Sequence, residues 1–196
     1  MKAIDTAQAR LRTYTIANFI AVQLAWWACV LGGASDFSIA GTALVVIGIV
    51  RHLGFARHPR REAELIVYAT AIGAVFDTAL IQLGLIRFHH GEFIAGFAPH
   101  WMLALWASFA TTFNLSLAWL KRHLPLAALL GAIAGPFAYW SGARLGAADL
   151  LEPKTTLLAI AGGWAMAMPL LMKLARHRDG FADTAVAATA ATGAGS

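Results

Sequence analysis

The sequence predicts an all-α, polytopic membrane protein with six transmembrane helices and both termini in the cytoplasm. Of its 196 residues, 59% are apolar and only 13% are charged, and the mean hydropathy is +0.66. Soluble domains carry about 25% charged residues, so this chain has too few to cover a soluble globule. The composition therefore excludes an ordinary soluble enzyme, a disordered chain and a disulfide-stapled secreted domain.

Six apolar runs are each long enough to cross a bilayer. A helix needs about 20 residues to span a hydrocarbon core of about 30 Å. The runs cover residues 15–34, 37–55, 63–86, 100–120, 124–143 and 155–174. Very short connections separate the first run from the second and the fourth from the fifth, so both pairs are predicted to form antiparallel hairpins. None of the runs has the pattern of a cleaved signal peptide.

Lysine and arginine residues predict the orientation of these runs. Twelve of them flank one side of the predicted spans, and three flank the other, namely Arg87, Arg144 and Lys154. Because cytoplasmic loops carry the excess of basic residues, both termini are expected in the cytoplasm. The same distribution accounts for the net charge of +5, so no nucleic-acid partner is predicted.

One transmembrane domain is predicted over residues 1–178. Residues 179–196 are rich in Ala, Thr and Gly, show no apolar periodicity and are expected to form a disordered tail. The sequence shows no internal repeat, which argues against the duplicated halves of many transporters. The single cysteine, Cys29, excludes an intrachain disulfide.

A stripe of glycines in the fifth run predicts a close helix contact. Its members lie four, seven and four residues apart: Gly131, Gly135, Gly142 and Gly146. Small residues at such spacings let two helix backbones approach closely. The expected partner is another helix of the same chain, and a second copy or another membrane protein is the alternative. Trp101 and Trp119, near opposite ends of the fourth run, are expected to anchor it at the membrane interfaces.

Asp77 is the carboxylate predicted to lie deepest in the membrane. Burying an ionisable group there costs at least about 2.5–3.5 kcal/mol. Thr70, Gly73 and Asp77 share one helical stripe, which places Asp77 toward the protein interior. Asp77 is therefore a candidate proton-relay or ligand-binding group, and a structural role in tying helices together is the alternative.

Polar residues of neighbouring runs complete the candidate interior site. The site consists of Asp77, Ser108, Thr111, Asn114, Ser116 and Tyr139. A second group is expected at the cytoplasmic mouth of a cavity and contains His52, Glu62 and Gln23. His52 and Glu62 can form a proton-transfer pair, and plain anchoring of the helix ends at the interface is the alternative.

Histidines on the non-cytoplasmic side raise the question of a metal site. His89, His90 and His100 are weak candidates. Adjacent histidines point apart on a helix and no cysteine contributes, so no metal site is predicted. The sequence contains no nucleotide-binding or serine-hydrolase motif and identifies neither catalytic residues nor a cofactor.

From the third run onward the sequence resembles a known family. The pattern includes Gly73, Asp77, Gly84, the segments 99–102 and 109–116, Gly131, Gly135, Pro136, Tyr139, Trp164 and Pro169. With Asn18, Gln23 and His52 nearer the N-terminus, the chain resembles the bacterial inner-membrane family catalogued as domain of unknown function 2878, over nearly all of residues 15–175. Leu115 stands where the family pattern leads us to expect a histidine, which weakens any role that needs three intramembrane histidines.

The resemblance implies a small, six-spanned protein of the bacterial inner membrane without an established activity. Members of the family often accompany lipid-modifying enzymes of the cyclopropane-fatty-acid type and stress-response genes. Membrane lipid is therefore the implied partner, and the chain is expected to handle or modify acyl lipids as an enzyme or as the partner of one. The alternatives are a small-solute or proton-coupled transporter and a structural subunit of a membrane complex.

Overall fold

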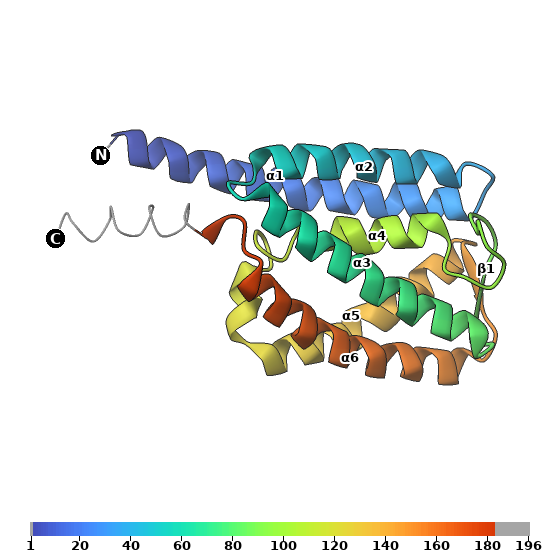
Figure 1. Cartoon of the computed structure of the whole chain (residues 1–196). Coiled ribbons are helices and arrows are strands. Elements are labelled where there is room, and N and C mark those ends of the chain that lie inside the picture. The colour runs from blue at the N-terminus through green and yellow to red at the C-terminus, as the bar shows by residue number, and fades with distance from the viewer. Residues whose placement is uncertain (1, 183–196) are drawn as a thin grey trace.

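The computed structural model describes residues 2–182, with side chains from residue 9 onward. Within these residues, long helices lie side by side and a two-stranded sheet joins them at one end (Figure 1). The helices are α1 (Lys2–Gly33), α2 (Ser38–Phe55), α3 (Pro59–Gln82), α4 (His100–Ala110), α5 (Leu124–Arg144) and α6 (Pro153–His177). Strands β1 (Ile86–Phe88) and β2 (Ala148–Leu150) pair antiparallel, with Arg87 opposite Asp149.

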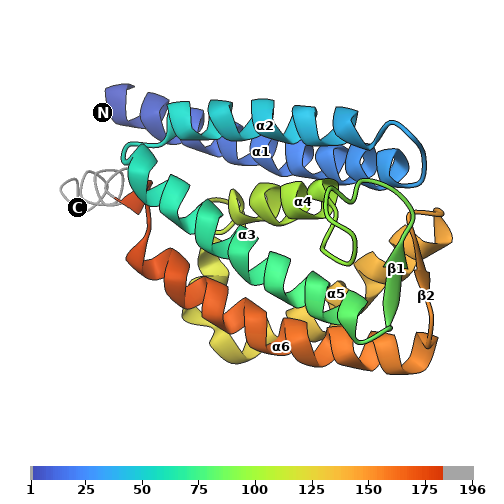
Figure 2. The same ribbon diagram turned by 45° about the vertical axis from the view of Figure 1, so that its right-hand side comes forward.

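The two ends of the bundle differ in what they hold. The start of α1, the end of α6, the α2–α3 connection and the start of α5 lie at one end, which we call the terminal end (Figures 1 and 2). Both strands and the loop 89–99 lie at the opposite end, which we call the sheet end. Successive helices therefore run in opposite directions.

Local signals explain where several helices begin and end. Pro59, Pro125 and Pro153 lie in the first turns of α3, α5 and α6, where a missing backbone N–H costs no helical hydrogen bond. After α3, Gly84 has a φ of 66°, and after α5, Gly146 has a φ of 88°. Glycine adopts this left-handed conformation without the steric cost of a side chain.

Five helical segments are long and apolar enough to cross a membrane: Ala9–Gly33 of α1, and α2, α3, α5 and α6. Large apolar side chains also cover their outer surfaces, and Ile47, Ile133 and Leu158 are each more than 60% exposed. A soluble protein rarely exposes so much contiguous apolar surface. The architecture is that of a multi-pass membrane protein.

The predicted fourth span is wrong as a continuous helix. Only its first part, α4, is α-helical, and the chain continues through turns at residues 111–117 into a short 3-10 helix, η1 (Ala118–Arg122). The hydroxyls of Thr111 and Thr112 donate to the carbonyls of Ser108 and Phe109, both at 2.7 Å. Such side-chain bonds compete with helical backbone bonds, which is why apolarity alone overestimated the length of this helix.

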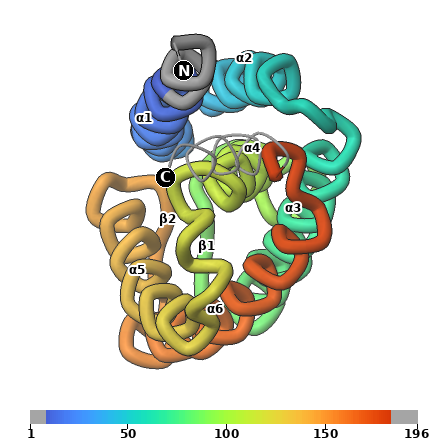
Figure 3. The backbone as a smooth tube through the Cα atoms, turned by 90° about the vertical axis from the view of Figure 1, so that its left-hand side faces the viewer, coloured from blue at the N-terminus to red at the C-terminus, as the bar shows by residue number. Residues whose placement is uncertain are grey.

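The irregular segment after α4 lies inside the protein. Residues 111–115 are all buried, and α4 itself lies near the centre of the bundle, surrounded by the other helices (Figure 3). Non-helical backbone at membrane depth is tolerated where protein or a water-filled cavity encloses it. The segment 111–115 can therefore expose carbonyl and polar groups to the interior without exposing them to lipid.

One of the two predicted hairpins, that of the fourth and fifth runs, is wrong. α1 packs along α2 as predicted, but α5 packs mainly along α6, and α4 packs against α1, α2 and α3. Two members of the glycine stripe, Gly131 and Gly135, account for the close α5–α6 contact, because a Cβ atom on Gly131 would lie 2.5 Å from the carbonyl oxygen of Trp164. Gly135 faces the Trp164 ring in the same way. Because α5 packs along α6, a pocket lies between α4 and α5.

Trp101 is not the interfacial anchor that its position near the end of the run suggested. Its side chain is 1% exposed, and its indole N–H donates to the carbonyl of His90 at 2.8 Å. The loop 89–99 folds over the start of α4 and buries this ring. Trp119, by contrast, is 52% exposed near the terminal end.

Candidate functional site

Asp77 lies fully buried between three helices. Its Oδ2 accepts the indole N–H of Trp106 from α4 at 2.8 Å, and its Oδ1 accepts the hydroxyl of Tyr139 from α5 at 2.5 Å. Gly73, one helical turn before Asp77, allows the close approach of α4, because a Cβ there would lie 2.1 Å from Cγ of Trp106. A carboxylate, a phenol and an indole thus form one hydrogen-bonded unit in the apolar interior.

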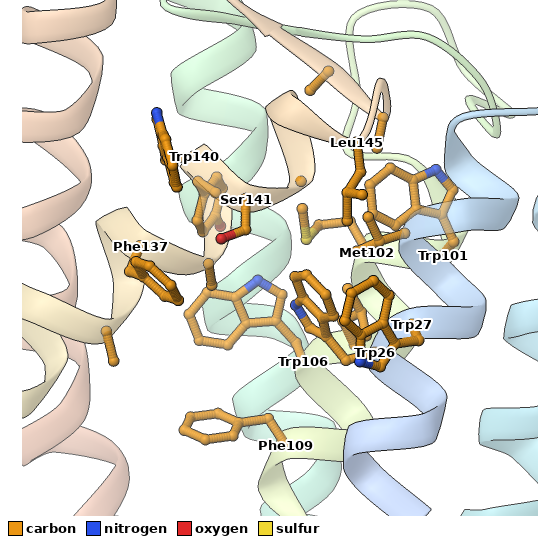
Figure 4. A pocket seen from close by; sticks show the side chains of 18 of the residues that line it. Trp26, Trp27, Trp101, Met102, Trp106, Phe109, Phe137, Trp140, Ser141 and Leu145 are labelled. Atoms are coloured by element: carbon orange, nitrogen blue, oxygen red, sulfur yellow. The ribbon is translucent and has the colours of Figure 1, made fainter.

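Trp106 and Tyr139 also form part of the wall of a large cavity, which we call the aromatic pocket. Its volume is about 740 Å³, and α1, α4, α5 and Trp164 of α6 contribute most of its lining. Six of the seven tryptophans line it: Trp26, Trp27, Trp101, Trp106, Trp140 and Trp164. Figure 4 shows the rings of α1 and α4 facing those of α5 across this space.

The aromatic pocket opens on the lateral surface between α1 and α5. Trp27 of α1 and Phe137 and Trp140 of α5 line it, yet they are 50%, 65% and 46% exposed. Residues that both line a cavity and lie at the outer surface mark its mouth. Arg144, the last residue of α5, also lines the pocket and is exposed at the sheet end.

A second polar unit, the Glu62 cluster, lies near the terminal end. Oε2 of Glu62 contacts Nε2 of His52 at 2.9 Å, and both side chains are fully buried. Oε1 accepts the side-chain N–H of Asn114 and the backbone N–H of Gly180, both at 2.7 Å. On the other side of the imidazole, the Tyr14 hydroxyl lies 3.2 Å from Nδ1 of His52. The predicted His52–Glu62 contact is therefore formed.

The start of the predicted tail is part of this cluster. Nζ of Lys121 donates to Oδ2 of Asp179 at 2.6 Å and to Oδ1 of Asn114 at 2.9 Å. Phe181 is only 5% exposed and packs beside His52 and Tyr14. The packed chain thus extends to residues 179–182, beyond the predicted boundary at 178, and residues 183–196 lie outside the described part of the chain.

A smaller cavity of about 200 Å³, which we call the Tyr14 pocket, lies between α1, α2 and α4. Tyr14, Asn18, Arg51, Ser108 and Thr111 contribute its polar lining, and the rest is mainly aliphatic. The amide nitrogen of Asn18 donates to Thr111 Oγ1 at 3.1 Å. Its Oδ1 is buried without a donor among the described residues.

The structure distributes the six predicted interior residues over several places. Asp77 and Tyr139 contact each other, Thr111 contacts Asn18, and Asn114 belongs to the Glu62 cluster. Ser108 lines both pockets, and the buried Oγ of Ser116 has no partner among the described residues. Gln23 lines the aromatic pocket rather than joining His52 and Glu62. The candidate set is therefore divided among the hydrogen-bonded unit at Asp77, the Tyr14 pocket and the Glu62 cluster and does not form one site.

Sequence reasoning missed several members of these sites. Tyr14 precedes the first predicted span, Lys121 counts only toward orientation, and Gly180 lies in the predicted tail. Their roles depend on backbone or long-range contacts that leave no local pattern. The abundance of tryptophan was the one available signal for the aromatic pocket.

The histidines at the sheet end lie apart from one another. His89 and Arg87 contact Asp149 at 3.1 Å and 2.8 Å, and these hydrogen bonds, Arg87 first, hold the pKa of Asp149 below its usual range. His90 contacts Asp36, whereas Nδ1 of His100 contacts Thr42 at 2.7 Å. Among the described residues, no three His, Cys, Asp or Glu side chains come together as a metal site.

Comparisons with known proteins give one match. The profile of a family described as "Protein of unknown function (DUF2878)" matches residues 15–170. No curated protein and no solved structure matches the chain. The matched residues include Asp77, Trp106 and Tyr139, His52 and Glu62, and almost all of the lining of both pockets.

Proposed function

The chain belongs to the DUF2878 family of proteins of unknown function, and we propose that it binds acyl lipids through the aromatic pocket. The volume of about 740 Å³ carries this proposal. It lies within the range of about 300–1,000 Å³ typical of small-molecule sites. A cavity lined by aromatic rings and open toward the side of a membrane protein suits an acyl chain that enters from the bilayer.

The polar groups of the pocket support a lipid with an anionic headgroup. Arg144 lies at the sheet end of the aromatic pocket, where a headgroup would remain near the membrane surface while its acyl chain reaches inward. Arginine forms strong bidentate hydrogen bonds with phosphate and carboxylate groups. Tyr139 and Trp106 are already bonded to Asp77, so this carboxylate holds the deep wall of the pocket in place.

Charge distribution supports an orientation with both termini in the cytoplasm, and the bacterial inner membrane is the location that the family resemblance implies. Twelve of the fifteen basic residues flank the terminal end, and cytoplasmic loops carry such an excess. In this orientation α4 and the segment 111–122 make the fourth of six crossings. The mouth beside Arg144 then faces the leaflet remote from the cytoplasm.

Filling the pocket is expected to abolish lipid binding. A Cβ on Gly142 would lie 4.0 Å from Val30 of α1, so the ring in Gly142→Phe would occupy the space between α5 and α1. Native mass spectrometry of the purified protein should show at least about a tenfold loss of retained phospholipid, which corresponds to about 1.4 kcal/mol. Gly162→Phe is the matched control, because Gly162 of α6 faces open space. Equal retention by the two variants would exclude the aromatic pocket as the lipid site.

Removing the charge at the mouth is expected to change lipid preference rather than acyl binding. Arg144→Gln should reduce the preference for phosphatidylglycerol over phosphatidylcholine about threefold to tenfold, because one charge-assisted contact is lost. Lys154→Gln removes a basic residue near the same end that does not line the pocket, and it should leave the preference unchanged. The measurement is competition between the two lipids for the detergent-solubilised protein, and an unchanged ratio in Arg144→Gln would contradict the assigned headgroup position.

A further inference from the structure

We propose that the Tyr14 pocket binds the end of an acyl chain that enters through the aromatic pocket, and that Val22 and Ser108, between the two pockets, restrict the length of this chain. The proposal rests on lipid binding in the aromatic pocket and adds a second compartment to that site. Three observations carry it: the lining that the two pockets share, the depth that they cover together, and a polar contact that closes the far side.

Two residues belong to the lining of both pockets, Val22 of α1 and Ser108 of α4. Along α1, the aromatic pocket is lined from Val30 to Val22, and the Tyr14 pocket is lined from Ala25 to Tyr14. Helix α1 begins at the terminal end and ends at the sheet end (Figure 1), so the pockets follow one another along this helix. Val22 and Ser108 therefore form the boundary between the two pockets.

The aromatic pocket alone is shorter than one acyl chain. A helical rise of about 1.5 Å per residue gives about 12 Å along α1 from Val30 to Val22, and about 24 Å from Val30 to Tyr14. One leaflet, half of the hydrocarbon core, is about 15 Å thick, and an acyl chain covers this distance in a bilayer. Gly142, two residues before Arg144, lies opposite Val30. A chain whose headgroup is held at Arg144 therefore reaches the boundary, and its last part needs the space beyond.

Aliphatic side chains form the side of the Tyr14 pocket between α1 and α2. Ala25, Val45 and Ile49 contribute to this lining, and Ala25 and Val45 are buried. Such side chains make dispersion contacts with the methyl end of a chain and leave no polar group of their own without a partner. This side of the pocket is therefore the place where the end of an acyl chain fits.

A polar contact closes the way farther along α4. The amide nitrogen of Asn18 donates to Thr111 Oγ1 at 3.1 Å. Asn18 precedes Val22 by one helical turn, and Thr111 follows Ser108 by three residues. A chain that advanced between α1 and α4 would have to break this buried hydrogen bond, and unpaired buried polar groups are costly. The contact therefore limits the length of the chain, whose end turns toward α2.

Filling the Tyr14 pocket is expected to shift retained lipid toward shorter chains. Gly48 of α2 lines this pocket, and a Cβ there meets nothing within 4 Å, so the ring in Gly48→Phe has room to occupy it. Native mass spectrometry of the full-length protein, supplied with equal amounts of dilauroyl- and dipalmitoyl-phosphatidylglycerol, measures the ratio retained. Gly48→Phe should favour the dilauroyl lipid about tenfold more than wild type does, which corresponds to about 1.4 kcal/mol. Total retention should stay unchanged.

Gly54→Phe is the matched control for Gly48→Phe. Gly54 lies on the same helix, its Cβ would also meet nothing within 4 Å, and it lines neither pocket, so the ratio should equal that of wild type. A second pair tests the boundary itself. Val22→Phe narrows it and should shift the ratio in the same direction as Gly48→Phe, whereas Val50→Phe, at an exposed position outside both pockets, should not.

Removing the polar contact is expected to act in the opposite direction. Asn18→Ala opens the far side of the Tyr14 pocket and should raise the retention of distearoyl- over dipalmitoyl-phosphatidylglycerol. A shift toward shorter chains in this variant would contradict the limiting role of the Asn18–Thr111 contact. Melting temperatures verify that each variant remains folded.

Photocrosslinking tests the route by which the chain end arrives. Leu24, Leu44 and Ile47 line the Tyr14 pocket and are exposed at the outer surface, so this pocket also has a mouth of its own. A phosphatidylglycerol with a diazirine at the end of one acyl chain should label Val45, which is buried and out of reach of the surrounding lipid. Gly142→Phe, which fills the aromatic pocket, should remove this label.

The outcomes separate this inference from the proposed function. Retention of phospholipid with the same chain ratio in wild type, Gly48→Phe and Val22→Phe would overturn the inference and leave lipid binding in the aromatic pocket intact. Labelling of Val45 that persists in Gly142→Phe would also overturn it, because the chain would then enter through the mouth between α1 and α2. A wild-type protein that retains no phospholipid would contradict both proposals.

Discussion

Replacing Glu62 with leucine is expected to lower the free energy of unfolding by about 2–6 kcal/mol, because two buried donors lose their acceptor and each such loss costs about 1–3 kcal/mol. The carboxyl group of Glu62 accepts from Asn114 and Gly180 and contacts Nε2 of His52 within a fully buried space. Leucine leaves both donors without an acceptor and His52 without its partner. It also releases the segment 179–181, which the bond from the Gly180 N–H holds against α3.

Thermal melting in detergent and limited tryptic digestion measure these two effects. Glu62→Leu should melt far below wild type and be cleaved faster after Arg176 and Arg178. Glu64→Gln is the matched control, because Glu64 is 34% exposed in its ion pairs with Arg60 and Arg178, and such pairs contribute about 0–1 kcal/mol. Equal melting temperatures for Glu62→Leu and Glu64→Gln would contradict a stabilising role for the cluster.

Glu62→Gln refines the same experiment. The amide oxygen can still accept from Asn114 and Gly180, and the amide nitrogen can donate to Nε2 of His52 if the imidazole carries its proton on Nδ1. The loss of stability should therefore be well below that of Glu62→Leu.

Most of the fold follows from patterns that act along a single helix. Apolar length located the five helices that are long and apolar enough to cross a membrane, because a helix in a membrane must satisfy its backbone hydrogen bonds within itself. The same rule failed for residues 111–117, where threonine hydroxyls bond to the backbone and the surrounding protein encloses the chain. The pairing of α5 with α6 was also missed, since a short connection does not decide which faces are complementary.

The candidate sites depend more strongly than the fold on contacts between helices, so less of them could be predicted from the sequence. The inward direction of Asp77 followed from helical geometry, and its side chain is fully buried. The contact between His52 and Glu62 was also expected from their places at the ends of neighbouring helices. Nothing local in the sequence indicates that Gly180 donates to Glu62, 118 positions away, or that Trp106 is the partner of Asp77. Hydrogen bonds across a bundle depend on which helices become neighbours, and that was the uncertain part of the fold.

Gly73→Ala is expected to destabilise the protein by about 1–3 kcal/mol, the usual cost of overpacking a core, and to open the wall of the aromatic pocket. The added Cβ would lie 2.1 Å from Cγ and 2.3 Å from Cδ1 and Cδ2 of the Trp106 ring. A rigid indole cannot move aside at its base without shifting α4 away from α3. That shift breaks the 2.8 Å bond between Trp106 and Asp77, so one methyl group affects both helix packing and the site.

Gly162→Ala provides the matched control for this substitution. A Cβ on Gly162 meets nothing within 4 Å, and alanine is favoured over glycine in a helix by roughly 0.5–1 kcal/mol, so this variant should melt at or above the wild-type temperature. The indole N–H resonance of Trp106 should shift in Gly73→Ala and stay in place in Gly162→Ala. Trp106→Leu should cost less stability when combined with Gly73→Ala than it costs alone, because the clash is then removed. If the losses of stability in Gly73→Ala and Trp106→Leu were additive, Gly73 and Trp106 would not act through their contact. Asp77 would then be held in place without the contact between Gly73 and Trp106.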